Sequence, residues 1–226
     1  MKKIILSIAL IFSACQAKIA APPSQTAELA TDRSTAIAIA SDLAISSKGI
    51  GKAKLGMTLG KLKEISDSDT VFEKISSFMV DVDAIAVSKK GIVQYYILYL
   101  AGDSSESQGN AIDPNLVITA LMTDNDNYQT EQGVKVGTSI EEAEEIYGDA
   151  ILAYNTEGES REYVTFNSQH PENIQFRASY FKLISDGLGF SGIYPEYPGV
   201  SYTTDKYRDG AAIAAIEVSC NPNDCT

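Results

Sequence analysis

The chain has 226 residues, 44% of them hydrophobic, and is long enough to bury a core. Its formal net charge of −12 argues against nucleic acid as a partner, because binding to phosphates requires clustered lysine and arginine. The acidity mainly promotes solubility. With 3 cysteines and 1 histidine, the chain has few groups for nucleophilic or zinc chemistry, so we expect neither a cofactor nor a metal.

The N-terminal residues have the pattern of a bacterial export signal. Lys2 and Lys3 precede an uncharged apolar run over residues 4–12, and small residues then lead to Cys15. The run is shorter than the roughly 20 residues that a transmembrane helix needs. We therefore expect residues 1–14 to be a signal peptide.

The end of this signal resembles the lipobox of bacterial lipoproteins. Phe12-Ser13-Ala14-Cys15 follows that pattern, except that the family usually has Leu where Phe12 stands. The resemblance implies a diacylated Cys15 as the first mature residue and the acyl chains as a membrane anchor, with Gln16 favouring the outer membrane over the inner. Cleavage after Ala17, which would give an unanchored exported protein, remains an alternative.

The other two cysteines lie close together near residue 226. Cys220 and Cys225 flank the turn-forming sequence Asn221-Pro222-Asn223-Asp224. Lipidation of Cys15 would leave this even pair, and an exported protein meets conditions in which disulfides persist. We predict a Cys220–Cys225 disulfide that fastens the C-terminal tail.

Residues 15–33 are rich in Ala, Pro, Ser, Thr and Gln and have no apolar periodicity. This composition predicts a flexible tether between the anchor and a folded domain over residues 34–226.

The domain contains an internal repeat, in which residues 54–65 align with residues 135–146. Thr58 and Ser139 stand at helix N-cap positions, and apolar residues follow each at helical spacing. Ser139 and Glu142 form a capping-box pattern. Gly148 is a natural end for the second helix.

Strand-forming segments follow each predicted helix. They span residues 70–75, 78–87, 92–100 and 116–122 after the first, and 151–155, 162–166, 174–180 and 212–219 after the second. This order predicts an α+β fold with two repeats of a helix and an antiparallel meander, over about residues 45–123 and 128–220.

The Gly56-Met57-Thr58 turn, its helix and the repeated meander resemble envelope modules of the SmpA/OmlA type and the tandem-repeat β-lactamase inhibitory protein. The second copy departs from this pattern, with Thr138-Ser139 in place of Met-Thr. The resemblance implies a binding scaffold without chemistry of its own.

Candidate chemical groups in the domain are sparse. His170 precedes Pro171 in a polar stretch, which favours a surface loop over a catalytic base. Asp124 and Asp126 alternate as calcium ligands would, but the glycine and terminal acid of an EF-hand loop are missing, so a solvated turn is favoured. Asp81 and Asp83 are interpreted as the solvent-exposed face of a strand.

One segment, over residues 180–207, does not fit the meander. It is rich in aromatic residues, and its candidate partner-binding side chains are Phe190, Tyr194, Tyr197, Tyr202 and Tyr207. Such rings serve interfaces as readily as cores, so both interpretations remain open.

These observations favour a non-enzymatic module that binds an envelope protein or peptide. Two alternatives remain: a glycan-active enzyme that uses carboxylates alone, and a sensor for a small ligand or calcium.

Overall fold

The computed structural model describes residues 42–100, 113–168, 170–178, 189–196 and 198–220. These residues all belong to one compact unit, Ile37–Thr226, which is described by itself. The predicted signal peptide, Cys15 and the tether lie outside the described residues, as does Cys225.

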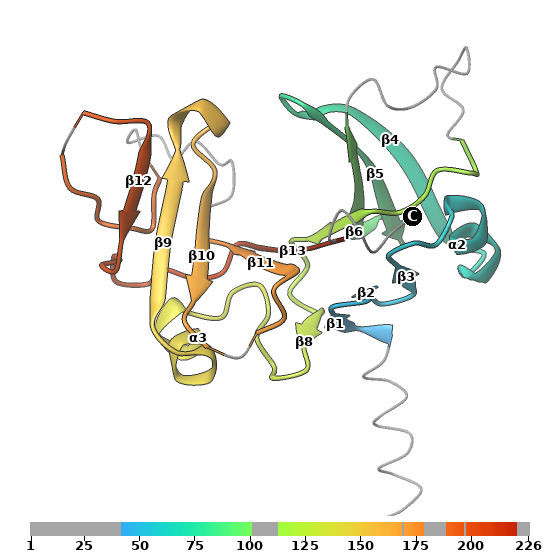
Figure 1. The fold of residues 1–226 in the computed structure, drawn as a ribbon. Coiled ribbons are helices and arrows are strands. Elements are labelled where there is room, and N and C mark those ends of the chain that lie inside the picture. Colours follow the sequence, from blue (N-terminus) through green and yellow to red (C-terminus); the bar gives the residue numbers. More distant parts are fainter. Residues whose placement is uncertain (1–41, 101–112, 169, 179–188, 197, 221–226) are drawn as a thin grey trace, which may run out of the picture. The chain divides into compact units, whose positions relative to one another are not determined.

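A nine-stranded sheet forms the main part of the unit (Figure 1). Its strand order is β12-β9-β10-β11-β13-β7-β6-β5-β4, and every neighbouring pair is antiparallel. The strands are β4 (Thr70–Met79), β5 (Val82–Lys89), β6 (Ile92–Leu100), β7 (Ala120–Thr123), β9 (Ala150–Asn155), β10 (Glu162–Phe166), β11 (Ile174–Arg177), β12 (Ser201–Thr204) and β13 (Ala215–Ser219).

A second sheet is built from short strands that the sequence analysis did not predict. It has the order β3-β2-β1-β8, with β1 (Ala44–Ser46), β2 (Gly49–Ile50), β3 (Ala53–Lys54) and β8 (Gln129–Thr130). Strands β1 and β8 pair in parallel, and the other pairs are antiparallel. This small sheet therefore joins residues that precede the first helix to residues that precede the second.

The two predicted helices are present as α2 (Leu59–Ile65) and α3 (Ile140–Tyr147). Thr58 caps α2 by accepting the Lys61 N–H, while Ser139 and Glu142 form a reciprocal capping box on α3. Gly148 ends α3 with a φ of 85°, a conformation that glycine adopts without steric cost. A 3₁₀ turn, η1 (Thr156–Gly158), follows β9.

Both helices pack on the same face of the large sheet, which we call the helix face. Leu59 and Leu62 of α2, and Ile140 and Tyr147 of α3, share one buried cluster with alternate residues of the strands. The opposite face carries a smaller buried cluster, which we call the opposite-face cluster. It comprises Met79, Ala84, Ala86, Tyr96, Leu98, Met122 and Ala215.

The backbone around the two helices is bonded in the same way. The Gly56 N–H donates to Ile118 O, and the Gly137 N–H donates to Ile213 O, both at 2.8 Å. Two further bonds recur in each half. The Ile118 N–H donates to Met57 O in the first half, as the Ile213 N–H donates to Thr138 O in the second. Likewise, the Leu59 N–H donates to Leu116 O, and the Ile140 N–H donates to Ala211 O. Each set ties the turn before a helix to the segment that enters β7 or β13, and these two strands pair with each other.

The sheet-rich α+β class agrees with the sequence, but two strand predictions require correction. The single strand predicted over residues 78–87 is two strands, β4 and β5, joined by a turn at Val80 and Asp81. The aromatic segment also contributes a strand, β12, which extends the sheet beside β9. The polar and apolar pattern of residues 201–204 did not predict β12, because its pairing partner β9 lies far away in the sequence.

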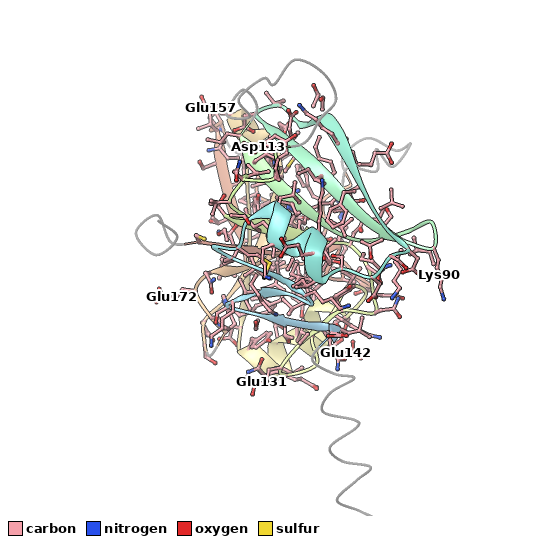
Figure 2. The ribbon with its side chains drawn as sticks, turned by 90° about the vertical axis from the view of Figure 1, so that its right-hand side faces the viewer. Lys90, Asp113, Glu131, Glu142, Glu157 and Glu172 are labelled. Atoms are coloured by element: carbon pink, nitrogen blue, oxygen red, sulfur yellow. The ribbon has the colours of Figure 1, made fainter. Side chains whose placement is uncertain are left out.

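Acidic side chains stand on the surface of the described domain. Glu131, Glu142, Glu157 and Glu172 are exposed and project outward from the ribbon (Figure 2). These carboxylates are therefore displayed to solvent, where negative charge favours solubility.

Candidate functional site

Four aromatic side chains gather at the edge of the large sheet, where β12 is the outermost strand. Tyr202 on β12 is paired directly with Tyr154 on β9, so their side chains stand on the same face. Phe190 and Tyr194 join them from the segment that precedes β12. We call Tyr154, Phe190, Tyr194 and Tyr202 the aromatic edge cluster.

Tyr154 is the centre of this cluster. Its ring stacks on Phe190 at a centroid distance of 4.1 Å and on Tyr202 at 4.7 Å. The Tyr194 ring meets it edge-on at 4.6 Å. Offset and edge-on contacts of this kind stabilise aromatic groups beyond the burial of their area, so the four rings position one another.

A buried carboxylate fixes the position of Tyr194. Glu162 is 0% exposed and accepts hydrogen bonds from the Ser191 N–H, the Gly192 N–H and the Tyr194 hydroxyl, at 2.7–2.8 Å. Burial and the neighbouring charge of Glu162 raise the pKa of Tyr194 well above its ordinary value. The neutral hydroxyl is thus retained as a donor to Glu162.

Gly192 is needed at this point for space. A Cβ atom there would lie 2.7 Å from the ring of Tyr194 and 2.9 Å from Thr204 Cγ2. The absence of a side chain lets the segment pass closely beside β12, where Gly192 forms an isolated bridge with Tyr207.

The cluster borders an open pocket of about 660 Å³, a volume in the range of ligand sites. Its lining consists of Tyr154, Phe190, Gly192, Tyr194, Pro195, Glu196, Pro198, Tyr202 and Arg208. The hydroxyls of Tyr194 and Tyr202 already donate to Glu162 and to Gly199 O. Aromatic and proline side chains supply most of the lining, with Glu196 and Arg208 as its charged groups.

The predicted partner-binding residues separate into three groups. Phe190, Tyr194 and Tyr202 come together, while Tyr197 lies outside the described residues. Tyr207 is separate from the cluster, and its role as a partner-binding residue stays a prediction. Its hydroxyl donates to Glu144 on α3 at 2.7 Å, and this bond is the main cause that raises the pKa of Tyr207 to about 12.

Sequence analysis missed Tyr154, the centre of the cluster, because it lies within a predicted strand. No signal in the neighbouring residues marks it for a site. Only the cross-strand register of β9 with β12 brings it opposite Tyr202.

Asp124 and Asp126, the candidate calcium ligands, flank Asn125, whose side chain holds the local backbone. Asn125 donates its amide to Val93 O and accepts bonds from Asn127, while Asp124 accepts a long bond from the Tyr96 hydroxyl. These bonds form a turn at this position, as the sequence favoured, but Asn125 is buried rather than solvated. Within the described residues, no group of three or more His, Cys, Asp or Glu side chains is arranged to hold a metal ion.

The remaining candidate residues have structural partners. His170 packs edge-on against Tyr147, Phe166 and Phe176, so it borders the main core as well as a loop. The interpretation of Asp81 and Asp83 as one exposed face is wrong. Asp81 lies in the β4–β5 turn, and Asp83 is buried, where it accepts the Ser77 N–H at 2.7 Å.

A smaller pocket, of about 140 Å³, lies at the ionic group of Asp67, Lys52 and Lys89. Asp67 accepts bonds from both lysines, at 2.8 and 2.5 Å, and these bonds lower its pKa to about 2. The two cations are therefore already neutralised in part by a residue of the pocket itself.

Cys220 follows β13, and its N–H donates to Thr119 O at 2.8 Å. Its predicted partner Cys225 is not among the described residues, so the disulfide remains a prediction. None of the described helices has the length and apolar character required to cross a membrane. Comparisons of the chain with protein-family models, curated proteins and solved structures found no match.

Proposed function

We propose that this chain is a bacterial envelope lipoprotein whose folded domain binds a partner protein or peptide through the aromatic edge cluster. The observation that supports this proposal best is the exposure of the cluster. All four rings are only half-buried, although they are large and tightly stacked. Aromatic residues that combine a fixed position with accessible surface are the usual centres of binding energy at interfaces.

The main core does not explain why the cluster exists. Of its four members, Tyr194 is the one that packs against the large buried cluster of the helix face. Tyr154, Phe190 and Tyr202 instead contact one another beyond it, at the pocket. Their stacking is thus consistent with a preformed contact surface, which lowers the entropic cost of binding.

The scaffold is proposed to be a tandem duplication. The equivalent hydrogen bonds of Gly56 and Gly137, and the pairing of β7 with β13 between the halves, support this idea. The aromatic segment between β11 and β13 has no counterpart of the same composition between β6 and β7 in the sequence. In a duplicated domain, a segment that differs between the halves is where we place a specific contact.

Site-directed photocrosslinking in the native cell tests the contact surface. A photoreactive phenylalanine analogue is placed at Tyr202 or at Phe190, and at Glu172 as an exposed control on another part of the domain. We expect a light-dependent adduct with the same envelope protein at both cluster positions and none at the control. Equal adducts at all three positions, or adducts at none, would contradict the proposed surface.

The anchor has an independent test. Mass spectrometry of the mature protein should find an acylated Cys15 as the first residue, and Cys15→Ser should release the protein from the membrane fraction. An unmodified mature chain that begins at Lys18 would contradict the lipoprotein proposal without affecting the photocrosslinking result.

A further inference from the structure

The tips of two distant hairpins meet across the opposite face of the large sheet. The turn between β4 and β5 contains Val80 and Asp81, and the turn between β9 and β10 spans residues 156–161. The Val80 N–H donates to Glu159 Oε1 at 2.7 Å, and these two residues are 79 positions apart in the sequence. Arg161 donates to Asp81 Oδ1 at 3.1 Å. We call these two turns together the clasp.

Three non-glycine residues in or beside the clasp adopt left-handed backbone conformations. Ser77 has a φ of 57°, Glu159 of 58° and Ser160 of 54°. Among the described residues, the other non-glycine residue with a positive φ is Lys90, which precedes Gly91 in the β5–β6 turn. Each such conformation costs free energy, and it persists where surrounding contacts enforce it.

The contacts that hold the clasp closed are few. Val80 is 80% exposed, so its side chain contributes little apolar burial. The Asp81 carboxylate is 67% exposed, and an ion pair that is open to solvent is weak. Met79 is the apolar anchor of this turn, being 5% exposed and accepting a hydrogen bond from Arg177 at 3.4 Å.

The clasp adjoins apolar surface that it helps to bury. Met79 belongs to the opposite-face cluster, with Tyr96 and Leu98 of β6, and the Phe78 ring lies tilted against Tyr96 at a centroid distance of 4.8 Å. Arg177, which donates to Met79, also forms an ion pair with Glu217, and its guanidinium lies over the ring of Tyr163. Because Met79 directly precedes Val80, separation of the two turns would loosen its contact with these groups.

We propose that the clasp is a strained gate, which opens locally in the folded protein and uncovers the opposite-face cluster. The backbone strain favours opening, whereas the bonds of Val80 and Arg161 favour closure. The gate does not rest on the proposed function, although its β9–β10 turn directly precedes Glu162, which anchors Tyr194.

Hydrogen–deuterium exchange with mass spectrometry tests the gate. Amides of the two clasp turns, residues 80–81 and 156–161, should exchange together, at least tenfold faster than those of β6 and β13. Arg161→Ala should accelerate exchange of both clasp turns several-fold and increase the fluorescence of an apolar dye. The milder variant Asp81→Asn, which keeps the shape of the side chain, should act in the same direction.

Glycine substitutions separate strain from ordinary loop mobility. Ser160→Gly removes the steric cost of a left-handed residue in the clasp and should slow exchange of both clasp turns several-fold. Lys90→Gly relieves the same kind of strain elsewhere and should leave them unchanged. Clasp amides that exchange at the rate of global unfolding would overturn the gate, as would equal effects of the two glycine variants.

Discussion

The buried carboxylate of Glu162 accepts a hydrogen bond from the Tyr194 hydroxyl at 2.8 Å, and two backbone N–H groups donate to the same carboxylate. It therefore connects β10 to the segment that forms the aromatic edge cluster.

Glu162→Gln should reduce the free energy of unfolding by about 3 kcal/mol, because an NH2 group would replace one of the two oxygens that accept these bonds and would face a donor there. Chemical denaturation measures the change. Glu172→Gln, at an exposed position, is the control and should shift stability by less than about 0.5 kcal/mol. A loss at Glu162 no larger than at Glu172 would contradict the anchoring role.

Tyr154→Ala should cost about 2–3 kcal/mol, because it removes the ring on which both Phe190 and Tyr202 stack. Tyr202→Ala removes one stacking contact at the edge and should cost about 1 kcal/mol. Denaturation of the two variants gives the comparison. The expected order is reversed if Tyr202, rather than Tyr154, organises the cluster.

The two helix caps should differ in strength. Ser139 accepts the Glu142 N–H at 3.1 Å within a complete capping box, whereas Thr58 accepts the Lys61 N–H at 3.3 Å without one. Ser139→Ala should cost about 1 kcal/mol and Thr58→Ala about 0.5 kcal/mol, as measured by thermal or chemical unfolding. Equal losses would mean that the reciprocal Glu142 bond adds nothing.

Asp67 should contribute to the loss of stability at acidic pH. Its hydrogen bonds with Lys52 and Lys89 lower its pKa from 3.8 to about 2 in the folded protein. Its contribution is therefore present above pH 3.8 and is lost as the pH falls through about 2. Asp67→Asn should flatten the dependence of unfolding free energy on pH in this window. Asp69→Asn provides the neighbouring control, and an unchanged slope in Asp67→Asn would exclude the effect.

Local structure was predictable where nearby residues decide it. The N-caps Thr58 and Ser139 and the end of α3 at Gly148 follow from hydrogen bonds and dihedral angles within one turn of chain. The strands β6 and β10 were likewise predicted at their observed bounds, because turns and β-branched or aromatic residues mark them.

The aromatic edge cluster was predictable in part. Phe190, Tyr194 and Tyr202 stood out because an aromatic-rich segment interrupted the meander. Tyr207 was grouped with them on composition, yet the position of α3 gives its hydroxyl a different partner, Glu144. Composition identifies which segment is unusual, whereas packing decides which of its rings meet.

An acidic, mainly antiparallel domain with two capped helices could be predicted from sequence, because charge, alternation and capping are local properties. The central position of Tyr154 in the cluster and the contact of Val80 with Glu159 arise only in the folded chain. Both relationships depend on strand register and on sheet order, which bring together residues that have no common local pattern.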